Sequence, residues 1–169
     1  MSAEAVAQCA KLGVMVDIQP AWLWLDGETL SLQFGAPRLR YFQPLKSLFE
    51  TGAIVGGGSD HMQRIGAMRS VNPYHPFLGM EITQTRLPRN MSEPLHTVEA
   101  LTPLQALRMY TINNAKIMFL DDVTGSLEAG KLADLIVVDR DPLSTPASEL
   151  RQTQVLRTYL GGKLVYEKK

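Results

Sequence analysis

The sequence has little of several features that would identify its class at once. Cys9 is its single cysteine, which excludes an intramolecular disulfide and a metal cluster of several thiolates. Lys and Arg number 17, as do Asp and Glu, so the formal net charge is zero and indicates neither nucleic acid nor an anionic membrane as partner. Apolar runs such as 135–138 fall far short of the roughly 20 residues of a membrane span. Because residues 1–11 lack a signal-peptide pattern, we expect a cytoplasmic protein without membrane segments.

What is present fits a globular chain. Its 169 residues are 45% hydrophobic and 20% charged, enough for one sizeable core. The pattern predicts two parts, residues 1–120 and residues 121–169. In the first we expect helices over Ala3–Leu12, Pro44–Glu50, Pro76–Arg86 and 104–119, strands over Val14–Ile18 and Ala53–Gly56, and a long aromatic-rich loop over 21–43. Such alternation is typical of a parallel sheet with crossover helices, so we predict an α/β fold.

After Leu120 the helical period disappears and glycines separate short apolar runs. Leu135–Val138 is predicted to be a buried strand. Val155–Leu160 and Lys163–Glu167 flank Gly161-Gly162, the two-residue turn of a β-hairpin. We therefore expect residues 121–169 to form a small β unit.

One stretch has catalytic character, the glycine-rich run Gly56–His61 at the carboxyl end of a predicted parallel strand. In α/β folds the chemistry lies at this end of the strands. Asp60 could ligate a metal or act as a general base there. Alternatively, Ser59 or Asp60 caps the following turn, as such residues commonly do.

The other candidates carry weaker signals. His61, His75 and His96 have no metal-ligand spacing, so we expect surface or hydrogen-bonded histidines. Trp22 and Trp24 either line a pocket or pack beneath their loop. Cys9 lies in an ordinary helix and is expected to be a small buried apolar residue.

Three groups of residues carry a family resemblance. They are Leu12-Gly13-Val14 with Gln19-Pro20, then Gly58-Ser59-Asp60, then Leu101-Thr102-Pro103 with Ala106–Ala115. The stretch Gly125–Pro142, GSLEAGKLADLIVVDRDP, is the most specific. Together they resemble the amidohydrolase superfamily, and within it amidohydrolase family 3.

The resemblance implies a (β/α)8 barrel with a metal site at the carboxyl ends of its strands, plus a small β-sandwich. Family members hydrolyse C–N bonds, such as amides, with a metal-activated water. By motif position Asp60 is the catalytic proton shuttle and a metal ligand, and zinc is the expected metal. Trp22, Trp24 and His61 are the candidate contacts to a small-molecule substrate.

The sequence departs from the family by omission. A complete barrel needs about 250 residues, and the family's H-x-H motif is absent from these 169. The chain therefore resembles the C-terminal portion of a larger enzyme, with an incomplete barrel. Alone it is expected to be inactive and to bind no zinc tightly. We expect its exposed strand edges to recruit the missing N-terminal part or a second copy. The alternative is a stand-alone, non-catalytic remnant or interaction module.

Overall fold

The structure is a computed structural model that describes residues 1–61 and 75–169. Its α-helices are α1 (Ala3–Lys11), α2 (Pro20–Phe34), α3 (Leu45–Glu50), α4 (Pro76–Thr85), α5 (Pro103–Tyr110) and α6 (Ile112–Ile117). Its strands are β1 (Val16–Ile18), β2 (Val55–Gly57), β3 (Leu135–Val138), β4 (Val155–Leu160) and β5 (Lys163–Glu167). Short 3-10 helices are η1 (Ala36–Leu39), η2 (Thr97–Glu99) and η3 (Ala147–Gln152).

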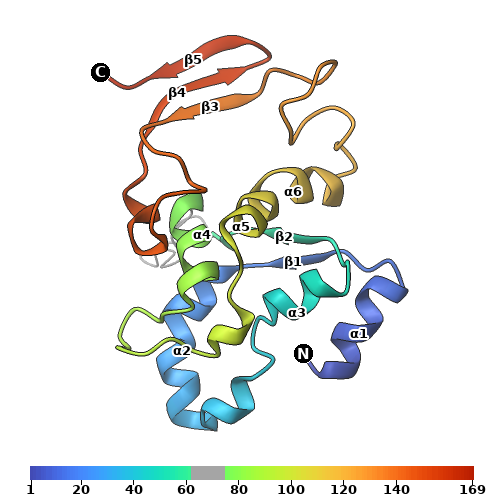
Figure 1. The fold of residues 1–169 in the computed structure, drawn as a ribbon, viewed down its shortest axis with the longest axis vertical. Helices are drawn as coiled ribbons and strands as arrows, with labels where there is room; N and C mark the ends of the chain where they lie inside the picture. Colours follow the sequence, from blue (N-terminus) through green and yellow to red (C-terminus); the bar gives the residue numbers. More distant parts are fainter. Residues whose placement is uncertain (62–74) are drawn as a thin grey trace, which may run out of the picture.

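The centre of the molecule is a parallel pair of strands between two groups of helices. β1 and β2 pair with Val16 opposite Val55. The helices α1 to α3 lie on one side of the pair, and α5 and α6 lie on the other, while α4 crosses the level of the strands and also packs against α2 (Figure 1). Leu48, Val55 and Met109 are fully buried between them. This arrangement confirms the predicted α/β character.

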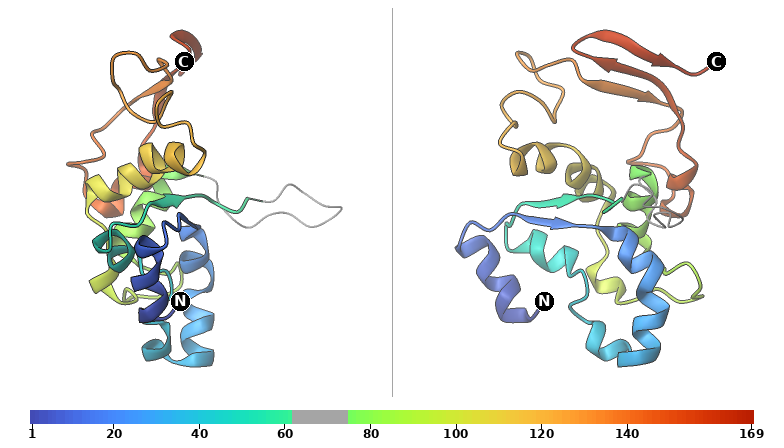
Figure 2. Two further views of the ribbon diagram at one scale, coloured as in Figure 1. Left: turned by 90° about the vertical axis from the view of Figure 1, so that its right-hand side faces the viewer. Right: turned by 180° about the vertical axis from the view of Figure 1, so that it is seen from behind.

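The C-terminal strands form a separate antiparallel sheet in the order β3-β4-β5. Gly161 and Gly162 have φ of 55° and 78°, the left-handed values that a two-residue hairpin turn requires, so the predicted hairpin is confirmed. The prediction that β3 is buried is wrong, because Ile136 and Val137 remain 48% and 40% exposed. The reason is visible in Figure 2, where this sheet stands away from the helices.

The 3-10 helix η3, which lies between β3 and β4 in the chain, packs against α4. Leu150 of η3 is fully buried in the main core. Arg151 forms an ion pair with Glu81 of α4, and its backbone N–H donates to the same carboxylate at 3.1 Å. Glu81 is 4% exposed, so its charge requires this partner. The two-part division at residue 120 stays a prediction.

The long loop predicted over residues 21–43 is wrong, because this stretch contains α2 and η1. Pro20 occupies the first turn of α2, where its fixed φ suits a helix and its missing N–H costs nothing. Gly27 within the helix allows Pro88 to pack, since a Cβ there would lie 2.6 Å from Pro88 Cγ. The predicted single helix over 104–119 is also interrupted, at Thr111 between α5 and α6.

In the described part of the chain, no helix is long and apolar enough to cross a membrane.

Candidate functional site

The candidate site lies where β1 and β2 end. Asp60 follows β2 with φ of 48°, a left-handed conformation that aspartate tolerates better than most residues. The indole Nε1 of Trp22, in the first turn of α2 after β1, donates to Asp60 Oδ2 at 3.1 Å. Two neighbouring strand ends therefore meet at one carboxylate, which is exposed.

Trp24 lies elsewhere. Residues two apart on a helix are rotated by about 200°, so α2 turns Trp24 away from Trp22. Its ring packs beneath Arg89, whose guanidinium carbon lies 5.8 Å from the ring centroid. The structure thus brings Trp22, but not Trp24, onto Asp60, and a substrate contact by Trp24 stays a prediction.

The histidines occupy separate places. His75 caps α4, accepting from the Leu78 N–H at 3.2 Å, and the ring of His96 hydrogen-bonds the Ala36 carbonyl at 2.7 Å. Both confirm the expectation of hydrogen-bonded histidines. His61 is exposed and directly follows Asp60 in the chain. Its contact with substrate stays a prediction.

The outer edge of β2 is closed by side chains from α6. Asn114 accepts from the Gly57 N–H at 3.0 Å and donates to the Gly57 carbonyl at 2.9 Å. Asn113 donates to the Val55 carbonyl at 2.9 Å. The sequence predicts an open edge here, and these amides instead form much of the hydrogen bonding that another strand would provide.

A cavity of about 200 Å³ opens beside the end of β2. It is bordered by Gly57, Gly58 and Ser59, by residues of α4, and by Tyr110 at the end of α5. Burial, and secondarily the charge of Asp17, raise the pKa of Tyr110 above its ordinary value, so the phenol stays protonated.

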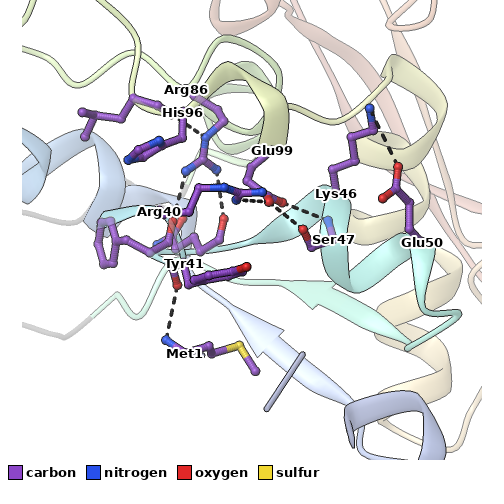
Figure 3. A network of polar contacts seen from close by, with 12 residues as sticks. Met1, Arg40, Tyr41, Lys46, Ser47, Glu50, Arg86, His96 and Glu99 are labelled. Atoms are coloured by element: carbon purple, nitrogen blue, oxygen red, sulfur yellow. Dashed lines mark hydrogen bonds and ion pairs between the residues drawn. The ribbon is translucent and has the colours of Figure 1, made fainter. Parts of the chain in front are cut away.

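A buried polar network supports the loops around this site (Figure 3). The Arg86 side chain is fully buried and donates to the carbonyls of Leu95, Gln43 and Phe42 at 2.7–3.0 Å. Gln43 in turn donates to the Gln19 carbonyl at 2.8 Å. Since Gln19 immediately precedes α2, this chain of bonds runs from Arg86 to the helix that carries Trp22.

Glu99 is the anionic member of that network and is fully buried. It pairs with Arg40 and accepts from Ser47 through the backbone N–H at 2.9 Å and the hydroxyl at 2.6 Å. Burial alone would raise the pKa of Glu99, but the bonds from Ser47 and Arg40 outweigh it and lower the pKa below its ordinary value.

A metal would find only part of its ligand set here. Within residues 1–61 and 75–169 no three His, Cys, Asp or Glu side chains lie close enough to hold an ion. A catalytic zinc takes three protein ligands, so these residues do not make a complete zinc site. That Asp60 is a metal ligand stays a prediction.

The structure shows a mixed α/β fold with a carboxylate at the strand ends, and comparison with known proteins identifies its family. The sequence matches the amidohydrolase family over residues 1–166. The chain belongs to that family. It is 37% identical over 163 residues to the N-substituted formamide deformylase of Arthrobacter pascens, covering 94% of this chain and 28% of that enzyme.

Solved structures agree on the fold. A metal-dependent hydrolase from Pyrococcus horikoshii superposes with a TM-score of 0.71 at 23% identity, over 88% of this chain and 29% of that one. An adenosine deaminase from Xanthomonas campestris, with zinc bound, gives 0.65 at 26% identity, over 97% and 34%. The chain therefore spans about a third or less of these relatives.

Sequence reasoning missed several residues that shape the site. Tyr110, Gly79 and Asn114 are among them, and each acts through a contact between distant segments. The available signal was the glycine-rich end of β2, since glycines there indicate that other groups approach the backbone closely.

Proposed function

We propose that this chain is the C-terminal part of a larger metal-dependent hydrolase that cleaves C–N bonds, such as amides, in a small-molecule substrate. The observation that carries the proposal is Asp60 at the carboxyl end of β2, held by Trp22 from the end of β1. Family membership over residues 1–166 supports it. So do relatives named as a deformylase and as deaminases, because those reactions break C–N bonds.

In this proposal β1 and β2 are the last strands of a (β/α)8 barrel, and β3 to β5 are the C-terminal part of a β-sandwich. The remaining strands come from the missing N-terminal part, and a second copy of the chain is the other partner we propose. We place the protein in the cytoplasm, which suits its free, buried Cys9.

Asp60 is assigned two tasks in the complete enzyme. A divalent metal such as zinc, when bound, activates a water molecule, and Asp60 would be one of its ligands. The Asp60 carboxylate would accept a proton from that water and donate it to the leaving nitrogen. Trp22, Trp24 and His61 are the proposed substrate contacts.

The test is Asp60→Asn in the complete enzyme. The amide keeps the shape but cannot accept the proton, so turnover should fall about 10²- to 10⁴-fold with an unchanged unfolding midpoint. Asp122→Asn, at an exposed aspartate outside the site, is the control and should retain full turnover. Near-full activity of Asp60→Asn would make Asp60 a structural cap instead.

The second candidate is a non-catalytic module. It is favoured by the incomplete ligand set of the described residues. Both candidates expect the 169-residue chain to lose zinc on dialysis against a chelator, and stoichiometric zinc afterwards would contradict that expectation. Turnover that appears when the missing part is supplied in trans favours the hydrolase, and its absence favours the module.

A further inference from the structure

The cavity beside the end of β2 has apolar walls and lies next to the candidate catalytic residue. Its volume is about 200 Å³. Apart from the strand-end glycines, most of its described walls are apolar residues of α2 and α4, namely Ala21, Pro76, Leu78, Gly79 and Ile82, and the ring of His75 at the start of α4 also borders it. Ser59, which immediately precedes Asp60, borders the same space. The cavity therefore adjoins the segment that carries Asp60.

Tyr110 supplies a polar group at the cavity border. A Cβ at Gly57 would lie 3.0 Å from the Tyr110 ring, and a Cβ at Gly79 would lie 1.9 Å from its hydroxyl oxygen. The ring thus spans from β2 to α4, and both glycines are required for it to fit. Among the described residues the hydroxyl has no hydrogen-bond partner, so a donor remains available at the border.

The size of the cavity restricts its occupant. An apolar cavity of about 150 Å³ in a protein core is large enough for benzene. About 200 Å³ accordingly fits one six-membered ring or a branched alkyl group of similar size.

We propose that this cavity binds the apolar substituent of the substrate, a group about one ring in size, and that the Tyr110 hydroxyl donates to the amide oxygen of the same molecule. Tyr110 is then a specificity-determining residue. The inference rests on the proposed function for the identity of the bound molecule, while the cavity and its hydroxyl stand on the geometry alone.

The experiment is an NMR titration of the 169-residue chain, labelled on the methyl groups of leucine and isoleucine. Benzene presents the ring alone, and benzamide presents the ring with an amide oxygen. Both ligands should shift the methyl signals of Leu78 and Ile82. Tyr110→Phe removes one hydrogen bond and should weaken benzamide about 2- to 10-fold while leaving benzene unchanged.

Two further variants sharpen the result. Tyr41→Phe alters a half-buried tyrosine outside the cavity and should leave both affinities unchanged. Ala21→Leu should fill the cavity and abolish both sets of shifts. If Ala21→Leu does not fold, Tyr110→Phe still decides, because it removes a single atom.

Either of two results would overturn the inference. One is that neither ligand moves the Leu78 and Ile82 methyl signals, which removes the cavity as a binding site. The other is that Tyr110→Phe leaves benzamide unchanged or weakens both ligands equally, which removes the role of the hydroxyl. A complete enzyme that hydrolyses no C–N bond would overturn the proposed function and leave these binding results standing.

Discussion

Replacing Glu99 by Gln tests whether the buried network holds the fold around the site. The substitution keeps the side-chain volume and removes the negative charge, which forms an ion pair with Arg40 and accepts hydrogen bonds from Ser47. The Arg40 side chain is 35% exposed and can turn to water, but Arg86, whose positive charge the Glu99 carboxylate also attracts, is fully buried and cannot. Removing one partner of a buried ion pair costs about 3–5 kcal/mol. Because glutamine still accepts one bond, we expect about 3 kcal/mol, a large share of the roughly 5–15 kcal/mol that stabilises a domain.

Glu50→Gln is the matched control. Glu50 pairs with Lys46 at 3.8 Å one helical turn away, and both side chains are largely exposed (Figure 3). An exposed pair of this kind contributes about 0.5 kcal/mol or less. Urea unfolding followed by tryptophan fluorescence measures both variants. If Glu99→Gln lies within 1 kcal/mol of the wild type, or no further from it than Glu50→Gln does, the reasoning is wrong.

The same variant has a defined pH dependence. The folded protein lowers the pKa of Glu99 below its ordinary 4.5, so the folded state favours the ionised carboxylate. The stabilisation is complete above the unfolded pKa and is lost as the pH falls through the folded pKa. The difference between wild type and Glu99→Gln should therefore be largest near pH 7 and should shrink as the pH falls below about 4. A difference that grows on acidification would contradict this sign.

Three other predictions concern the strand ends and the C-terminal sheet. Asn114→Leu should cost about 2–4 kcal/mol in urea unfolding, because the buried Gly57 N–H and carbonyl lose their partner; a cost below 1 kcal/mol would mean that water replaces the amide. In Asp60→Ala the indole proton signal of Trp22 should shift and that of Trp24 should not, and equal shifts would contradict the separation of the two rings. We also expect the chain to self-associate, so light scattering at micromolar concentration should give a mass above 18.7 kDa. Val165→Lys, on the exposed face of β5, should reduce that mass. A monomeric wild type would contradict self-association.

The sequence predicts most elements whose signals are local. Ser2 caps α1, and Thr102 and Gln105 form the capping box of α5, so both starts could be recognised from neighbouring residues. α2 was missed because it is apolar on several sides, with Trp22, Leu23 and Leu25 all at least half-buried, and no helical period shows in its pattern. Its one usable signal was the proline at its first position.

The candidate site likewise has one part that local sequence predicts and another that it does not. The position of Asp60 after β2 follows from a short apolar run that ends in glycines. The contacts of Tyr110 with Gly57 and Gly79 join residues 53 and 31 positions apart, and no local pattern encodes such pairings. The break at Thr111, which separates α5 from α6, has no neighbouring proline or glycine to signal it in the sequence.

Because asparagine side chains close the edge of β2, two adjacent amide protons should exchange with solvent through different opening motions. The Gly57 N–H is held by the Asn114 side chain, whereas the Gly58 N–H donates to the Ile18 carbonyl at 3.0 Å. Exchange at Gly57 therefore requires only that α6 lift from the strand, while exchange at Gly58 requires β1 and β2 to separate. Two adjacent peptide units thus report two distinct opening motions, and the ratio of their exchange rates measures how independently α6 moves from the strands beneath it.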